Sequence, residues 1–184
     1  MDILTPKEID QLLINRLTKT IDLYKKLDTT QIEVYNTIYF KLYFDVSTAI
    51  ENTISNILYI KYGNDNFIYY KSKIGSDSIS KYLPKEEIKL LVQNFGDTIK
   101  VGDIQNHFTI LKDIVKDSFY RNLGVDKMLY DIEEFNSFYT KSRDVRNKLA
   151  HGLTLTNVDF SAKMLFKFLS SYFVLKKLHE QVAN

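Results

Sequence analysis

The sequence predicts an all-α protein, a helical bundle built from four long helices. Long stretches carry apolar residues three or four positions apart, the spacing of an amphipathic helix. Capping motifs precede several of these stretches. Only two prolines and six glycines interrupt the 184 residues. The length fits a single domain over 1–184.

The first two long helices are expected at about 6–27 and 31–62. Thr5-Pro6-Lys7-Glu8 is a capping box with proline at the first helical position. Thr30-Gln31-Ile32-Glu33 is a second capping box, and Gly63 can supply a left-handed cap at the far end. These signals predict a long first hairpin.

The segment 63–125 is expected to be an insertion of short helices and loops between two hairpins. Its first part, 63–83, is rich in turn formers, and Phe67-Ile68-Tyr69-Tyr70 within it suits a short strand or a loop anchored by aromatics. Two shorter helices are predicted next, at about 84–94 after Pro84 and at about 104–122 with Asp103 as cap.

The last two long helices are expected at about 126–151 and 157–181, the latter after a capping box at Thr156-Asn157-Val158-Asp159. The helices at 31–62 and 157–181 carry apolar residues on more faces than one core requires. A surplus apolar face is typical of a second buried surface, so we expect a homodimer.

Composition excludes several classes of function. The chain has no cysteine, which excludes disulfides, zinc–cysteine sites and thiol nucleophiles. The net charge of +2 gives no global signature of nucleic-acid binding, so any such binding must be local. No apolar run of about 18 residues and no apolar signal core are present, so a soluble cytoplasmic protein without a membrane contact is expected. His107 and His179 stand alone, and we expect neither a metal site nor a cofactor.

The most informative motif is Arg146-Asn147-Lys148-Leu149-Ala150-His151-Gly152. Arginine binds phosphate through a planar fork of donors, and histidine transfers protons near neutral pH. Arg146 and His151 lie about 140° apart on an ideal helix, so one helix alone would not bring them together well. A basic footprint for a nucleic-acid backbone surrounds them and consists of Lys141, Arg143, Arg146 and Lys148, with only Asp144 opposing.

A structural interpretation of the motif stays open. Basic side chains in a last helical turn complement the macrodipole, and glycine is a common stop. On that account Arg146 to Gly152 is a well-made helix end.

The pattern Arg146-Asn147-x-x-Ala150-His151-Gly152, between two long helices near the C-terminus, resembles the HEPN superfamily. The resemblance does not cover 63–125. It implies a bundle of four or five helices, commonly a dimer with a shared cleft. It also implies a metal-independent RNA endonuclease of the toxin–antitoxin, abortive-infection or other antiviral kind.

The resemblance assigns roles to residues. Arg146 would bind the scissile phosphate, and His151 would act as base or acid or would orient the 2′-hydroxyl. Asn147 would hold the histidine or the phosphate by hydrogen bonding. Glu51 on the second helix matches the family's acidic position and would pair with Arg143 or Arg146. Alternatively, Glu51 lies on a solvated stripe with Asp45 and Ser55, which the sequence equally allows.

One departure concerns neutralisation. Members paired with a nucleotidyltransferase antitoxin carry a tyrosine two residues after the histidine that accepts adenylylation, and this chain has Leu153 there. Two rivals to the endonuclease remain: a non-catalytic HEPN-like antitoxin, adaptor or RNA-binding protein, and a helical interaction module unrelated to RNA.

Overall fold

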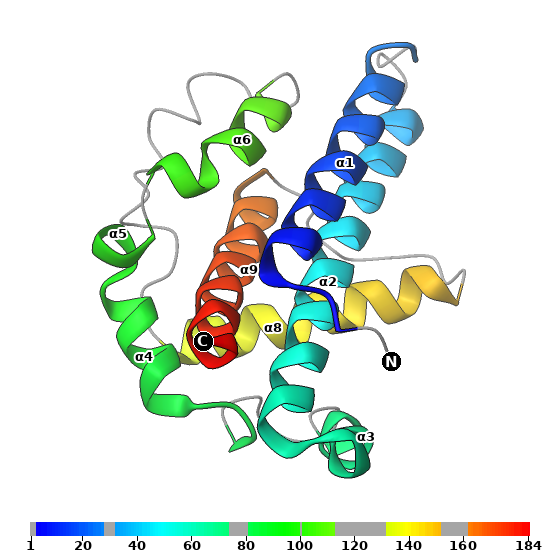
Figure 1. Ribbon diagram of the computed structural model, residues 1–184. Coiled ribbons are helices and arrows are strands. Elements are labelled where there is room, and N and C mark those ends of the chain that lie inside the picture. The colour runs from blue at the N-terminus through cyan, green and yellow to red at the C-terminus, as the bar shows by residue number, and fades with distance from the viewer. Residues whose placement is uncertain (1–2, 28–31, 74–80, 100, 113–131, 152–161) are drawn as a thin grey trace.

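The computed structural model describes residues 3–27, 32–73, 81–99, 101–112, 132–151 and 162–184. Every regular element in these ranges is a helix, which confirms the all-α prediction (Figure 1). The helices are α1 (Pro6–Tyr24), α2 (Ile32–Tyr62), α3 (Asn64–Lys73), α4 (Lys85–Gln93), α5 (Phe95–Thr98), α6 (Val101–Leu111), α8 (Ile132–Ala150) and α9 (Ala162–Ala183).

The predicted start of α1 and end of α2 are confirmed. The Thr5 hydroxyl accepts from the Glu8 amide while the Glu8 carboxylate accepts from the Thr5 amide. The Glu8 carboxylate accepts from the Thr5 amide at 2.7 Å and from the Thr5 hydroxyl at 2.8 Å, and these two hydrogen bonds, the amide one first, lower the pKa of Glu8. Gly63 ends α2 with a φ of 76°, a conformation that glycine adopts without steric cost.

The predicted strand or loop at 67–70 is wrong, because Asn64–Lys73 forms α3. Gly63, in its left-handed conformation, turns the chain and is the single residue between α2 and α3. The Gly63 carbonyl accepts from the Phe67 amide at 3.1 Å. Phe67 is buried against Tyr59, and Tyr70 stacks on Tyr62 with ring centres 3.8 Å apart. Tertiary packing of aromatics at helical spacing therefore outweighs the local turn propensity.

The core forms where α2 and α9 pack against each other, with α1, α8, α4 and α3 around them. Residues 165–175 of α9 are all buried, so the apolar faces of this helix that seemed surplus are covered within the chain. Five of the largest wholly buried side chains are Tyr43, Tyr172, Phe135, Phe166 and Phe168. The faces of α9 therefore give no argument for a dimer.

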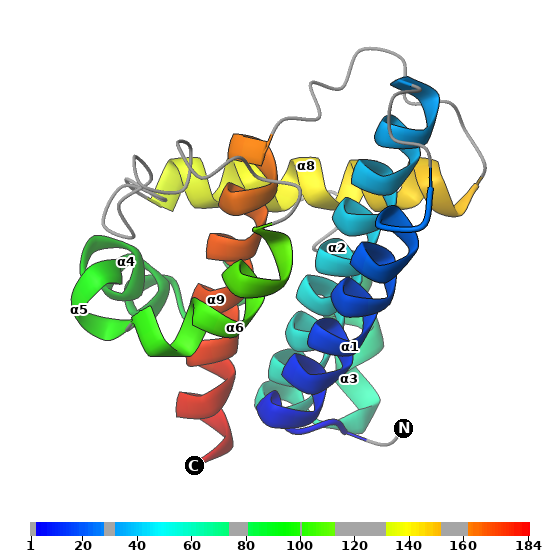
Figure 2. The ribbon, with the colours of Figure 1, turned by 90° about the horizontal axis from the view of Figure 1, so that it is seen from above.

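The two views show how the helices surround this core. α1 and α2 lie side by side, and α8 crosses α2 and α9 at a steep angle (Figure 2). The insertion helices α4, α5 and α6 form an arc around α9, and α5 was not predicted. No helix in the described residues has the length and apolar character needed to cross a membrane.

Several predictions fall outside the described residues. They are the capping residues at 30–31 and the capping box at 156–159, the end of the 104–122 helix near Gly124, the start of the helix expected from 126, and Leu153. Asp103 lies inside the first turn of α6, which begins at Val101, so it is not the residue that precedes the helix.

Candidate functional site

The last three turns of α8 carry the predicted site residues. Phe135 anchors the beginning of the helix in the core, and Arg143, Arg146 and Asn147 are half-buried further along. The Asn147 carbonyl accepts from the His151 amide at 3.1 Å, so the helical turn continues through the motif. Because α8 crosses α2, its half-buried face lies against the middle of that helix.

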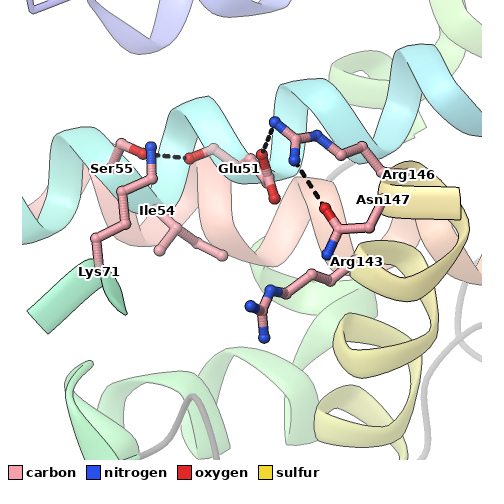
Figure 3. Close-up of a pocket in the computed structure, with 7 residues that line it drawn as sticks. All are labelled: Glu51, Ile54, Ser55, Lys71, Arg143, Arg146 and Asn147. Atoms are coloured by element: carbon pink, nitrogen blue, oxygen red, sulfur yellow. Dashed lines mark hydrogen bonds and ion pairs between the residues drawn. The ribbon is translucent and has the colours of Figure 1, made fainter. Parts of the chain in front are cut away.

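Arg146 bridges α8 to α2. The Nη2 atom lies 2.9 Å from a carboxylate oxygen of Glu51, and Nη1 donates to the Asn147 side-chain oxygen at 2.8 Å (Figure 3). The expected pairing of Glu51 with an arginine of α8 is therefore confirmed. The alternative solvated stripe is wrong, because Asp45 and Ser55 are both buried.

A pocket of about 210 Å³ lies beside this ion pair. Three helices line it: Glu51, Ile54 and Ser55 come from α2, Lys71 from α3, and Arg143, Arg146 and Asn147 from α8 (Figure 3). Three cationic side chains face one carboxylate, so the pocket has an excess of positive charge. Such a pocket suits an anionic group that can accept several hydrogen bonds.

The sequence interpretation missed Lys71 and Ser55. Ser55 is unavailable as a strong donor to a ligand, because its hydroxyl donates to the Glu51 carbonyl at 2.8 Å. Lys71 was missed because 67–70 was not predicted as a helix. Once α3 is a helix, Lys71 lies one turn after the buried Phe67, on the same face, and is directed towards α2.

The other predicted residues are distributed differently. His151 is exposed and is not among the residues that line the pocket. Lys148 also lies outside the pocket and pairs with Asp144 at 2.8 Å. The side chain of Lys141 lies outside the described residues. The structure thus brings together Glu51, Arg143, Arg146 and Asn147.

A second polar cluster joins α1, α6 and α9, and we call it the Asp10 cluster. Tyr172 donates to one oxygen of Asp10 at 2.9 Å, and Lys176 lies 2.8 Å from the other. The Nε2 atom of the buried His107 lies 3.0 Å from Asp10, and its ring meets the edge of Phe173. His107 is therefore part of the helix packing.

The Asp10 cluster has strongly shifted titration behaviour. Burial alone would raise the pKa of Asp10, but hydrogen bonds and charge from His107 and Lys176 outweigh it and lower the value to about 2. Burial, reinforced by the Asp10 carboxylate, raises the pKa of Tyr172. Outside this cluster, burial lowers the pKa of His179, and the charge of Glu180 opposes that shift. Among the described residues, no three His, Asp or Glu side chains group as metal ligands would.

Comparison of the chain with protein-family models, with curated proteins and with solved structures gives no match. The class that fold and site define is thus an all-α protein with a cationic pocket between α2, α3 and α8. The resemblance to the HEPN superfamily rests on the motif at Arg146–Gly152 and its position between two long helices.

Proposed function

We propose that this protein is a metal-independent endoribonuclease of the HEPN kind, acting as a toxin or antiviral effector. The pocket that carries Arg146 is the observation behind this proposal. Its three cations exceed its one carboxylate, and Arg146 retains donors beyond the two used by Glu51 and Asn147. A phosphodiester group supplies the acceptor oxygens and negative charge that this pocket favours.

The reaction is transesterification within the RNA. The 2′-hydroxyl loses its proton and attacks the adjacent phosphorus, and the bond to the 5′-oxygen breaks as that oxygen takes up a proton. The products carry a 2′,3′-cyclic phosphate and a 5′-hydroxyl. Arg146, held by Glu51 and Asn147, stabilises charge on the phosphoryl oxygens in the transition state. Arg143 adds positive charge beside it.

His151 supplies the proton transfer as base or acid. His151 is exposed and outside the pocket of its own chain. We therefore infer that a second copy of α8 lies across a two-fold axis and that its motif completes the site. A mixture of Arg146→Ala and His151→Ala chains would then regain part of the activity. A monomer in light scattering at micromolar concentration that still cuts RNA would contradict the shared site.

The decisive assay incubates the purified chain with total tRNA and mRNA, with and without excess EDTA. We expect cleavage in both conditions, with fragments that carry a cyclic phosphate. Loss of cleavage on chelation, restored by Mg²⁺ or Mn²⁺, would contradict the metal-independent mechanism. A small neighbouring open reading frame whose product blocks the cleavage would support the assignment as a toxin.

The second candidate is a non-catalytic RNA-binding, antitoxin or adaptor protein. The Arg146–Glu51 ion pair favours it, since an arginine that ties α8 to α2 has a structural task without any chemistry. This candidate predicts that the chain binds RNA and leaves it intact in the same assay.

A further inference from the structure

Four tyrosines gather at the junction of α2, α3 and the turn before α4, and we call them the tyrosine surface. They are Tyr62, Tyr69, Tyr70 and Tyr82, and Tyr70 contacts the other three. The ring centres lie 3.8 Å apart for the stacked Tyr62, 5.3 Å for the edge-on Tyr69 and 5.7 Å for Tyr82. The Tyr62 hydroxyl also donates to the Tyr82 carbonyl at 2.8 Å, which fixes the arrangement.

The outer end of this surface is open to solvent. Tyr69 is 58% exposed and its neighbour Ile68 is 68% exposed, whereas only Phe67 of α3 is buried. Helix α3 lies at the edge of the molecule, at the end of α2 (Figure 1). A rigid aromatic platform with one exposed ring is costly to leave in water and suits a flat apolar ligand.

The charges around the rings indicate which kind of flat ligand the tyrosine surface suits. The described residues 59–73 and 81–83 contain four lysines, Lys61, Lys71, Lys73 and Lys81, and one acid, Asp65. Three of the ammonium groups lie against the rings: Lys61 is 5.2 Å from the centre of Tyr62, Lys73 is 5.5 Å from Tyr69 and Lys81 is 5.7 Å from Tyr82. Aromatic rings with interleaved cations are the recognition chemistry of single-stranded nucleic acid.

The tyrosine surface and the cationic pocket share one helix. Lys71 of α3 lines the pocket, and Tyr69 and Tyr70 precede it directly in the same helix. A strand with a phosphate beside Lys71 and Arg146 can pass along α3 to the exposed ring of Tyr69. The pocket and the tyrosine surface are therefore adjacent along α3.

We propose that the tyrosine surface binds an unpaired base of single-stranded RNA by stacking on Tyr69, while neighbouring lysines pair with its phosphates. This inference rests on the proposed function, because it names RNA as the ligand of the adjoining pocket. It adds a subsite, on the insertion rather than on the hairpins that carry the motif. It also makes the preferred substrate single-stranded, since a duplex keeps its bases stacked on each other.

The test measures RNA binding without cleavage. Fluorescein-labelled single-stranded RNA of about ten nucleotides, with 2′-O-methyl riboses that cannot attack phosphorus, is titrated with the full chain by anisotropy. We expect Tyr69→Ala to weaken binding about tenfold or more. Tyr69→Phe keeps the ring and should bind within about twofold of the wild type. Leu90→Ala, which removes a 57%-exposed apolar side chain from α4, is the matched control.

Three outcomes would overturn the inference, and they are distinguishable. Equal binding by wild type, Tyr69→Ala and Leu90→Ala, with weaker binding by Arg146→Ala, would leave the proposed function intact and remove the subsite. No binding by the wild type would remove both. Unchanged RNA binding together with self-association that Tyr69→Ala abolishes in light scattering would assign the surface to a second copy. Circular dichroism confirms that each variant is folded.

Discussion

Two regions of this molecule hold a carboxylate against cations, and they differ in their exposure and in the open volume beside them. In the Asp10 cluster, one carboxylate between α1, α6 and α9 is matched by Tyr172, His107 and Lys176. In the pocket between α2, α3 and α8, the Glu51 carboxylate faces Arg146, with Arg143 and Lys71 also in the lining.

The difference separates structure from binding. Asp10 has its partners on both oxygens, and the buried His107 and Tyr172 that hold it belong to the core. The Arg146–Glu51 pair is more open, with the two side chains 36% and 18% exposed, and it borders a pocket of about 210 Å³. A carboxylate with partners on both oxygens stabilises the fold, whereas a pocket lined by three cations and one carboxylate suits an anionic ligand.

Substitution at the motif should have the largest effect on activity. Arg146→Ala and His151→Ala should each lower the cleavage rate about 10²–10⁴-fold, because each removes a group that acts in the transition state. Both side chains are partly or fully exposed, so Arg146→Ala should lower the free energy of unfolding by only about 1 kcal/mol. The measurements are single-turnover cleavage and urea unfolding.

The matched control is Lys177→Ala on α9. Lys177 is 39% exposed and pairs with Glu180 of the same helix at 3.0 Å, so it matches Arg146 in exposure and in the distance to its carboxylate. We expect its cleavage rate to stay at the wild-type value. Full activity in Arg146→Ala or His151→Ala would show that the motif only forms a helix end. It would then favour the non-catalytic candidate.

Substitution in the Asp10 cluster should show the opposite pattern. Asp10→Asn should lower the free energy of unfolding by about 3 kcal/mol, because it leaves the buried His107 and the half-buried Lys176 without the carboxylate. Asp22→Asn, at an exposed position of the same helix, is the control and should change stability little. If the folded Asp10→Asn protein loses cleavage at a temperature well below its melting point, the division between the two regions is wrong.

The pH dependence of stability should sharpen the same contrast. The pKa of Asp10 is lowered from 3.8 to about 2, so its contribution is present above pH 4 and is lost as pH falls towards 2. This shift corresponds to about 2 kcal/mol. Urea unfolding of wild type and Asp10→Asn between pH 7 and pH 2 measures it. The stability difference between the two should shrink on acidification, and a constant difference would contradict the coupling.

The smallest effect is expected at Lys71. Lys71→Ala should weaken RNA binding about tenfold and reduce the slope of log affinity against log salt by about 1, because one phosphate contact is removed. Lys89→Ala, which removes an exposed lysine from α4, is the control. Equal salt slopes for the wild type, Lys71→Ala and Lys89→Ala would show that Lys71 of α3 does not contact the RNA.

The sequence by itself determined the main helices, because their signals are local. The Thr5–Glu8 capping box, the apolar spacing of α2 and α9, and Gly63 depend on neighbours within a few positions. The motif on α8 stands out by its local spacing, whereas Glu51 follows from the resemblance to the HEPN superfamily. Their contact required only that two predicted helices cross with both residues inward, which α8 and α2 do.

Only the tertiary structure decided the rest. The helical state of α3 depends on Phe67 and Tyr70 meeting Tyr59 and Tyr62 of α2, and with it come Lys71 and the tyrosine surface. The Asp10 cluster joins residues about 160 positions apart, which no local spacing encodes. Whether an apolar face is covered by the same chain or left for a partner is likewise a property of packing, and in α9 the chain covers it itself.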